Sequence, residues 1–129
     1  MILKELIMRD PVTVEPEISI RDAARIMKRE GVGSLLVVEG GEPKGLVTER
    51  DIVYAIASDV SLDSEVENIM STNLVTAEST TEVSEAAMLM AGRKIRHLVV
   101  TEGGKVVGVI SLRDVARVLG LITSDLSIW

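Results

Sequence analysis

The chain has no cysteine and no phenylalanine, and only one histidine, one tyrosine and one tryptophan among its 129 residues. Without cysteine there is no disulfide framework, no thiolate metal site and no cysteine nucleophile. The shortage of aromatic rings argues against a surface on which successive nucleobases stack. The 20 acidic residues outnumber the 14 basic ones and give a net charge of -6. Because this charge repels a polyanion, nucleic acid is not the expected partner.

Long apolar runs are absent as well. The longest runs, such as residues 35–38 and 106–110, fall far short of the roughly 20 residues that a membrane span needs. The mixed, charged start of the chain does not resemble a signal peptide. We therefore expect a soluble, cytoplasmic protein with no membrane partner. Its core must be filled by aliphatic side chains and methionine.

What the sequence does contain is an internal repeat. A shift of 63 positions places residues 12–51 on residues 75–114, and 14 of these 40 positions are identical. Such agreement in one register indicates two copies of one unit. Near the start, residues 6–8 resemble residues 68–70 at a shift of 62, which predicts one residue inserted or deleted near Pro11. We expect residues 1–60 to form the first repeat and residues 61–129 the second repeat with a C-terminal tail.

Each copy predicts the same elements in the same order. Helical spacing of apolar residues, a Ser19 cap and a Gly31 stop predict the first helix, and adjacent glycines predict a hairpin turn. The expected elements are strand 12–14, helix 20–30, strands 35–38 and 44–48 and helix 49–57, then helix 83–93, strands 98–101 and 106–111 and helix 112–119. The polar stretch 58–64 is the expected linker. The fold class is α/β, with two tandem β-α-β-β-α repeats packed sheet to sheet about a pseudo-twofold axis and a cleft on each side.

The sharpest local motif is Gly-x-x-Thr/Ser-x-x-Asp, present at residues 45–51 and again at residues 108–114. In each copy a strand ends in a hydroxyl residue that opens a helix, with an aspartate three residues later. One interpretation is structural: Thr48 and Ser111 are helix N-caps, and the aspartates favour the helix dipole. The other is functional: the turn meets a phosphate while Asp51 or Asp114 accepts hydrogen bonds from ribose hydroxyls.

The repeat, the order of elements and this motif together resemble a tandem pair of cystathionine β-synthase (CBS) domains over residues 6–119. The resemblance implies a regulatory module that needs no cofactor. Its expected ligand is an adenosine compound, AMP first, with ADP, ATP and S-adenosylmethionine as alternatives, bound in the clefts between the repeats. It also implies a homodimer that signals to a separate effector protein.

The resemblance implies two sets of site residues. In the favoured cleft Asp114 would hold the ribose, with Ser111 and Arg113 near the phosphate. That whole set is Val12, Thr13, Val32, Gly33, Ser34, Arg96, Val109, Ser111, Arg113 and Asp114. The set for the second cleft is Leu46, Thr48, Arg50, Asp51, Val75, Thr76, Ile95 and His97. The Asp114 cleft is favoured because Arg96 stands where the first repeat has the uncharged Gly33.

Catalysis is not expected. A single histidine and no cysteine leave little material for a nucleophile–base pair or a zinc site. Asp51 and Asp114 would lie in different clefts, so they make a poor acid–base pair. The open alternative to a ligand sensor is a constitutive structural subunit with degenerate clefts. The tail, residues 122–129, matches nothing in the first repeat, and its role stays open.

Overall fold

A computed structural model describes residues 1–120 of the chain, as a mixed α/β fold with two three-stranded sheets. Its elements are η1 (Leu3–Leu6), β1 (Thr13–Val14), α1 (Ile20–Glu30), β2 (Ser34–Glu39), β3 (Glu42–Thr48), α2 (Glu49–Ala57), η2 (Val66–Asn68), β4 (Thr76–Glu78), α3 (Val83–Arg93), β5 (His97–Glu102), β6 (Lys105–Ser111) and α4 (Leu112–Val118). The predicted helices and strands are confirmed, with ends that agree within two residues. The tail at residues 122–129 lies outside the described residues.

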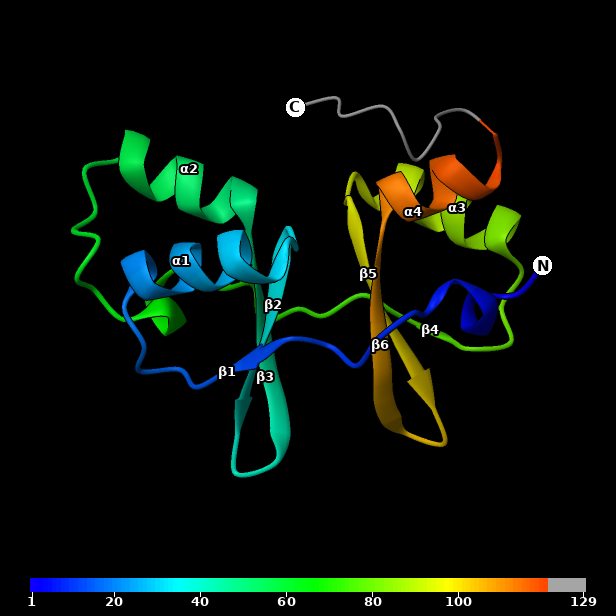
Figure 1. Cartoon of the computed structure of the whole chain (residues 1–129), viewed down its shortest axis with the longest axis horizontal. Coiled ribbons are helices and arrows are strands. Elements are labelled where there is room, and N and C mark those ends of the chain that lie inside the picture. The colour runs from blue at the N-terminus through cyan, green and yellow to red at the C-terminus, as the bar shows by residue number, and fades with distance from the viewer. Residues whose placement is uncertain (121–129) are drawn as a thin grey trace. The chain divides into compact units, whose positions relative to one another are not determined.

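The first-repeat unit consists of Pro11–Leu74. Its sheet has the order β1-β2-β3, with β1 parallel and β3 antiparallel to the central strand β2. Helices α1 and α2 cover one face of this sheet (Figure 1). The core between them joins α1, β2, β3 and α2, and its innermost side chains are Ile20, Ala23, Leu35, Val37, Val47 and Val66.

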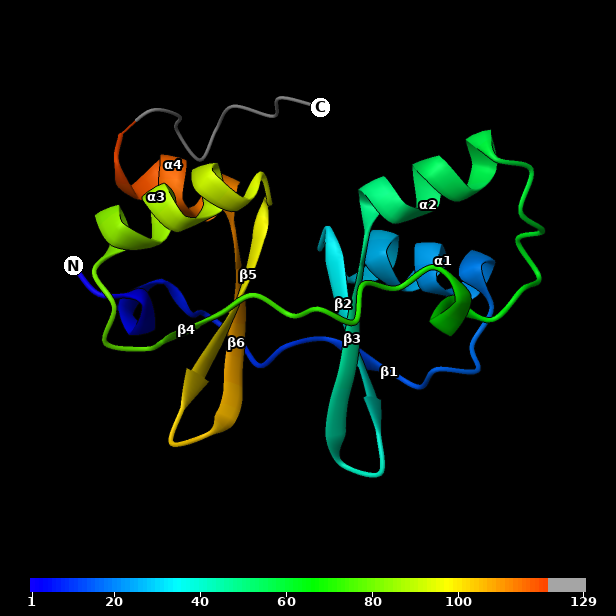
Figure 2. The same ribbon diagram turned by 180° about the vertical axis from the view of Figure 1, so that it is seen from behind.

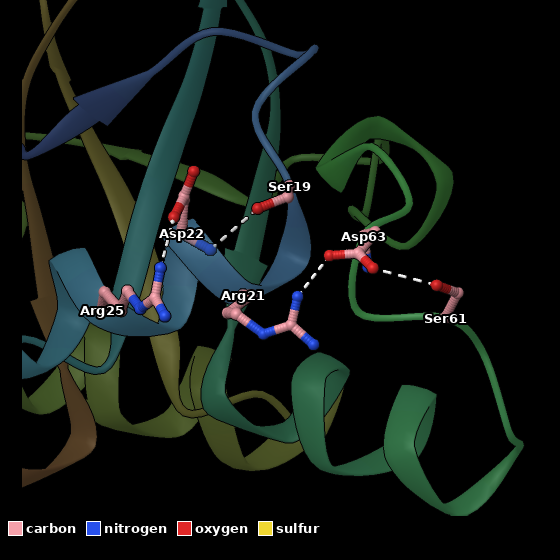
Figure 3. Close-up of polar contacts among 6 residues, drawn as sticks. All are labelled: Ser19, Arg21, Asp22, Arg25, Ser61 and Asp63. Carbon is pink, nitrogen blue, oxygen red and sulfur yellow. Dashed lines mark hydrogen bonds and ion pairs between the residues drawn. The ribbon is translucent and has the colours of Figure 1, made fainter.

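Helix α1 begins and ends at the predicted residues because both ends are capped. The Ser19 side chain accepts a hydrogen bond from the Asp22 backbone N–H at 3.0 Å, and Gly31 closes the helix at φ 68°. Figure 3 shows this cap and the pairing of Arg25 with Asp22 at 3.2 Å. The capped helix then presents its apolar stripe to the sheet.

The predicted linker, residues 58–64, belongs to the first-repeat unit and does not connect the two units. It is held against α1: the Arg21 backbone N–H donates to the Leu62 carbonyl oxygen at 3.0 Å, and the Arg21 guanidinium pairs with Asp63 (Figure 3). The chain instead passes between units at residues 10–11 and 74–75. A polar composition indicated a loop correctly, but it did not indicate where that loop packs.

The second-repeat unit consists of residues 75–120 together with Met1–Asp10. Its sheet repeats the order and directions of the first, as β4-β5-β6, and Figure 2 labels β4 next to β5 and β6. The 3₁₀ helix η1 supplies two core side chains, Leu3 at 0% and Leu6 at 9% exposure. They pack with Met90, Leu98 and Ile110. We call residues 1–10 and 64–73, which precede the two repeats in the sequence, the leading segments. The leading segment of the first repeat completes the core of the second-repeat unit, and that of the second repeat completes the core of the first-repeat unit.

Equivalent contacts show that these leading segments also obey the shift of 63. Leu3 N–H donates to the Thr81 carbonyl at 2.9 Å, and Val66 N–H donates to the Ile18 carbonyl at 2.7 Å. Ile7 lies over Gly108 as Met70 lies over Gly45. The predicted insertion or deletion near Pro11 is therefore wrong. The match at a shift of 62 was a chance likeness of short apolar triplets.

The hairpin turns follow the prediction from their paired glycines. Gly40 and Gly41 have φ values of 59° and 80°, and Gly103 and Gly104 have 59° and 79°. Such positive φ values fit the two-residue turn that connects twisted antiparallel strands. Within residues 1–120, no helix is long and apolar enough to cross a membrane.

Candidate nucleotide-binding turns

The two Gly-x-x-Thr/Ser-x-x-Asp motifs form strand-to-helix turns of the same geometry, which we call the β3–α2 turn and the β6–α4 turn. In the first, Thr48 N–H donates to Asp51 Oδ2 at 2.8 Å, and Asp51 N–H donates to Thr48 Oγ1 at 3.4 Å. In the second, Ser111 N–H donates to Asp114 Oδ2 at 2.8 Å, and Asp114 N–H donates to Ser111 Oγ at 3.1 Å. Both are reciprocal capping boxes, so the structural interpretation of the motif is confirmed.

The glycine that opens each motif has a structural cause. A Cβ placed on Gly45 would lie 2.6 Å from Met70 Sδ and 2.8 Å from the Ser71 carbonyl oxygen. A Cβ on Gly108 would lie 2.8 Å from Ile7 Cδ1. The segments around Met70 and Ile7 therefore approach their sheets closely at these glycines. The glycine of the motif is thus required for packing, and the hydroxyl residue and the aspartate are the positions available to a ligand.

The second-repeat unit brings most of its candidate residues to one end of its sheet. Leu112 N–H donates to the Arg96 carbonyl at 2.7 Å, and His97 pairs with Ser111 across β5 and β6. The Arg96 backbone is therefore adjacent to the β6–α4 turn, and a role for its side chain at that turn stays a prediction. Ile95 N–H donates to the Met90 carbonyl at 3.0 Å and closes α3.

A second row of candidates crosses the middle of the same sheet. Thr76 pairs with Val99, and Val99 pairs with Val109. Val99 N–H also donates to the Val75 carbonyl at 3.1 Å. The strand register thus places Val75, Thr76 and Val109 in one band across β4, β5 and β6, directly before the β6–α4 turn.

The first-repeat unit repeats this arrangement. Glu49 N–H donates to the Gly33 carbonyl at 3.0 Å, and Ser34 pairs with Thr48. The band across the middle joins Thr13, Leu36 and Leu46 by strand register. Val12 lies beside this band, because Leu36 N–H donates to the Val12 carbonyl at 2.9 Å, whereas Val32 N–H donates to the Met27 carbonyl of α1 at 3.1 Å.

Within each unit, then, the band and the turn come together. The predicted sets instead combine the turn of one unit with the strand of the other. Assignment of Val12, Thr13, Val32, Gly33 and Ser34 to the ligand of Asp114 stays a prediction. Assignment of Val75, Thr76, Ile95 and His97 to the ligand of Asp51 stays one too.

Side chains that the sequence interpretation did not single out distinguish the two turns. Arg50 Nε donates to the Tyr54 hydroxyl at 3.0 Å, and the guanidinium carbon lies 5.2 Å from the centre of the Tyr54 ring. Arg117 occupies the equivalent position to Tyr54 and pairs with Asp114 Oδ1 at 3.5 Å. A comparison of residues 63 positions apart would have found both, because the uncharged Tyr54 is replaced by the charged Arg117.

The described residues 1–120 contain no group of three or more histidine, cysteine or acidic side chains that could hold a metal ion. Each turn carries a carboxylate and a hydroxyl group, and Arg50 or Arg113 lies between them in the sequence.

Two sheets, each continued into a capped helix by a hydroxyl-x-x-Asp turn, define a class of proteins with paired β-α-β-β-α repeats. The sequence profile of the CBS domain matches the chain twice, at residues 3–58 and 66–121. The chain belongs to the CBS domain family.

Among curated relatives, an uncharacterised 17.7 kDa protein of Acidianus ambivalens is 40% identical over 108 residues, which cover 82% of this chain and 65% of that protein. The chain thus spans less than two thirds of that relative. An inosine-5′-monophosphate dehydrogenase of Korarchaeum cryptofilum is 34% identical, but the match covers only 23% of its length. The likeness to an enzyme is therefore confined to a minor part of it.

Two solved structures carry ligands. A CBS domain protein of Pyrobaculum aerophilum, complexed with AMP, is 32% identical with a TM-score of 0.80 over 88% of this chain and 89% of its own. The CBS domain pair of protein MJ0100, in complex with 5′-methylthioadenosine and S-adenosyl-L-methionine, is 29% identical with a TM-score of 0.85 over 93% and 96%. Both relatives bind adenosine compounds.

Proposed function

We propose that this chain is a regulatory module that binds an adenosine-containing ligand, AMP in the first place, at the β6–α4 turn. The observation that carries the proposal is the intact turn of Ser111, Arg113 and Asp114 with Arg96 directly beside it. It stands in a chain whose structural relative was solved with AMP.

The geometry of Asp114 suits a ribose. One carboxylate oxygen, Oδ2, is held by the Ser111 backbone N–H, which fixes the orientation of the group. The other, Oδ1, meets only Arg117 at 3.5 Å among the described residues, and the Asp114 side chain is 36% exposed. A carboxylate held in this way accepts hydrogen bonds from two vicinal hydroxyls at little cost in entropy. Arg96 and Arg113 supply positive charge for a phosphate.

A regulatory role follows from binding only if the ligand has different affinities for two conformations of the protein. We propose that AMP shifts such an equilibrium and that a separate effector protein reads the result, either from one chain or from a homodimer. ADP, ATP and S-adenosylmethionine are the competing ligands, because all share the adenosine group that Asp114 would hold.

Thermal unfolding of the full chain tests the proposal. A ligand present at about 100 times its Kd adds about 2.7 kcal/mol to the free energy of unfolding, which corresponds to a rise on the order of 10 °C for a chain of this size. We expect AMP to give the largest rise among AMP, ADP, ATP, S-adenosylmethionine and NADH.

Asp114→Ala and Asp51→Ala form a matched pair of variants. Each removes one capping box and is expected to cost about 1 kcal/mol of stability. Only Asp114→Ala should abolish the response to AMP. If no adenosine compound stabilises the wild-type chain at millimolar concentration, the proposal is wrong. An AMP response lost in Asp51→Ala and kept in Asp114→Ala would place the site in the first-repeat unit.

A further inference from the structure

The two turns have matching backbones but opposite charge. Thr48 and Ser111 have φ and ψ values of -120° and 167°, and of -104° and 160°. The anchoring hydrogen bond to the aspartate is 2.8 Å in both. Because the frames agree this closely, the side chains around them decide what each turn accepts.

Five equivalent positions, 63 residues apart, line the start of α2 and α4. They are Gly33 and Arg96, Glu49 and Leu112, Arg50 and Arg113, Asp51 and Asp114, and Tyr54 and Arg117. Three of the five pairs differ, and all three differences make the β6–α4 turn more positive. Three arginines and one carboxylate stand at that turn, where Arg117 pairs with Asp114 Oδ1 at 3.5 Å, against one arginine and two carboxylates at the β3–α2 turn.

The single arginine of the β3–α2 turn is also engaged elsewhere. Its Nε donates to the Tyr54 hydroxyl at 3.0 Å, and its guanidinium lies over the Tyr54 ring. Turning Arg50 to a phosphate would break both contacts. Glu49, exposed and the first residue of α2, adds a second carboxylate two residues before Asp51.

We infer that the β3–α2 turn takes adenosine-type ligands that carry no phosphate, whereas the β6–α4 turn takes phosphorylated ones. This inference rests on the proposed function. A nucleoside monophosphate carries nearly two negative charges at neutral pH. One carboxylate a few ångströms away weakens its binding by about tenfold or more, and does not weaken a neutral nucleoside. Glu49 is the specificity-determining residue, and Leu112 is its counterpart.

Isothermal titration of the full chain with AMP and with adenosine tests the inference, because the two probes differ only in the phosphate. In Asp114→Ala the β3–α2 turn is the one that stays intact, and adenosine should bind to this variant at least about tenfold more tightly than AMP. Adding Glu49→Leu should reduce that preference by about tenfold. In Asp51→Ala, AMP should bind more tightly, and Leu112→Glu should weaken AMP by about tenfold but not adenosine.

Thermal unfolding without ligand checks that each variant is folded, and Asp114→Asn, which keeps an acceptor for the Ser111 N–H, replaces Asp114→Ala if needed. The inference is overturned if the β3–α2 turn binds AMP as tightly as adenosine, binds neither while the wild type binds AMP, or keeps its preference in Glu49→Leu. A wild-type chain that binds neither probe contradicts the proposed function itself.

Discussion

At the scale of single residues, two glycines hold the sheets and the leading segments in contact. Gly45 faces the Met70 side chain and the Ser71 backbone, and Gly108 faces the Ile7 side chain. A side chain can rotate away from a new methyl group, but a backbone carbonyl cannot move without its strand. Leu46 and Ser71 exchange backbone hydrogen bonds of 2.9 Å in both directions, which fixes that strand.

We therefore predict that Gly45→Ala lowers the free energy of unfolding by about 1–3 kcal/mol, the usual cost of overpacking. Gly108→Ala should cost less, because Ile7 can change its rotamer. Chemical denaturation measures both. The control is Gly92→Ala: no heavy atom lies within 4 Å of a Cβ there, so within α3 alanine should stabilise by about 0.4–1 kcal/mol. Equal losses in Gly45→Ala and Gly92→Ala would contradict the packing argument.

At the scale of elements, η1 and η2 meet equivalent corners of the two sheets with opposite electrostatics. Lys4 Nζ lies 3.3 Å from Glu102, which also accepts a hydrogen bond from the buried Ser79 hydroxyl at 2.9 Å. The Ser79 hydrogen bond and then Lys4 lower the pKa of Glu102. In the first-repeat unit Glu67 replaces Lys4 and Glu39 replaces Glu102.

Glu67 therefore stands among like charges. Partial desolvation raises the pKa of Glu67 first, and repulsion from Glu65, Glu17 and Glu39 raises it further. A carboxyl whose pKa is higher in the folded chain destabilises the fold when ionised. That destabilisation is present at neutral pH and is relieved as the pH falls through the raised pKa.

We predict that Glu67→Lys raises the midpoint of thermal unfolding at pH 7, because it removes the repulsion and pairs a cation with Glu39 as Lys4 pairs with Glu102. The advantage over the wild type should shrink as the pH is lowered through the pKa of Glu67, where the wild-type carboxyl becomes neutral. Melting curves across that range measure it. A gain that is independent of pH would show that charge is not its cause.

The helices and strands could be predicted well from the sequence because the pattern of each element occurs twice, once in each repeat. Helix α1 was marked by its Ser19 cap, its apolar spacing and Gly31, and all three act in the structure as expected. The leading segments were harder, since η1 and η2 are 3₁₀ helices of four and three residues, too short for any periodicity. Their register and their packing partner come from tertiary contacts such as Ile7 on Gly108.

The candidate turns were predictable for the same local reason. Thr48, Ser111 and their aspartates lie within three residues of each other, so a capping motif fixes their geometry. The roles of Tyr54 and Arg117 depend on one further helical turn, which the motif does not include. The pairing of strands with turns into ligand sites depends on long-range placement, which no local pattern encodes.

At the scale of the whole molecule, the first ten residues belong to the unit of the second repeat. Deletion of residues 1–10 removes Leu3 and Leu6 from that core. We predict that hydrogen exchange then accelerates in β5, β6 and α3, while the amides of α1 and β2 stay protected. Mass spectrometry of exchanged peptides locates the loss. Faster hydrogen exchange in the first-repeat unit instead would contradict the assignment of residues 1–10 to the second-repeat unit.

Our proposal that AMP binds at the β6–α4 turn can be checked residue by residue in an NMR titration of the isotopically labelled chain with AMP. We predict saturable shifts of the amide signals of Arg96, Ser111, Arg113 and Asp114, and their loss in Asp114→Ala. The Asp51→Ala variant, with the matching cap removed from the other unit, should keep them. An absence of shifts at millimolar AMP, or shifts confined to residues 48–51, would contradict the claim.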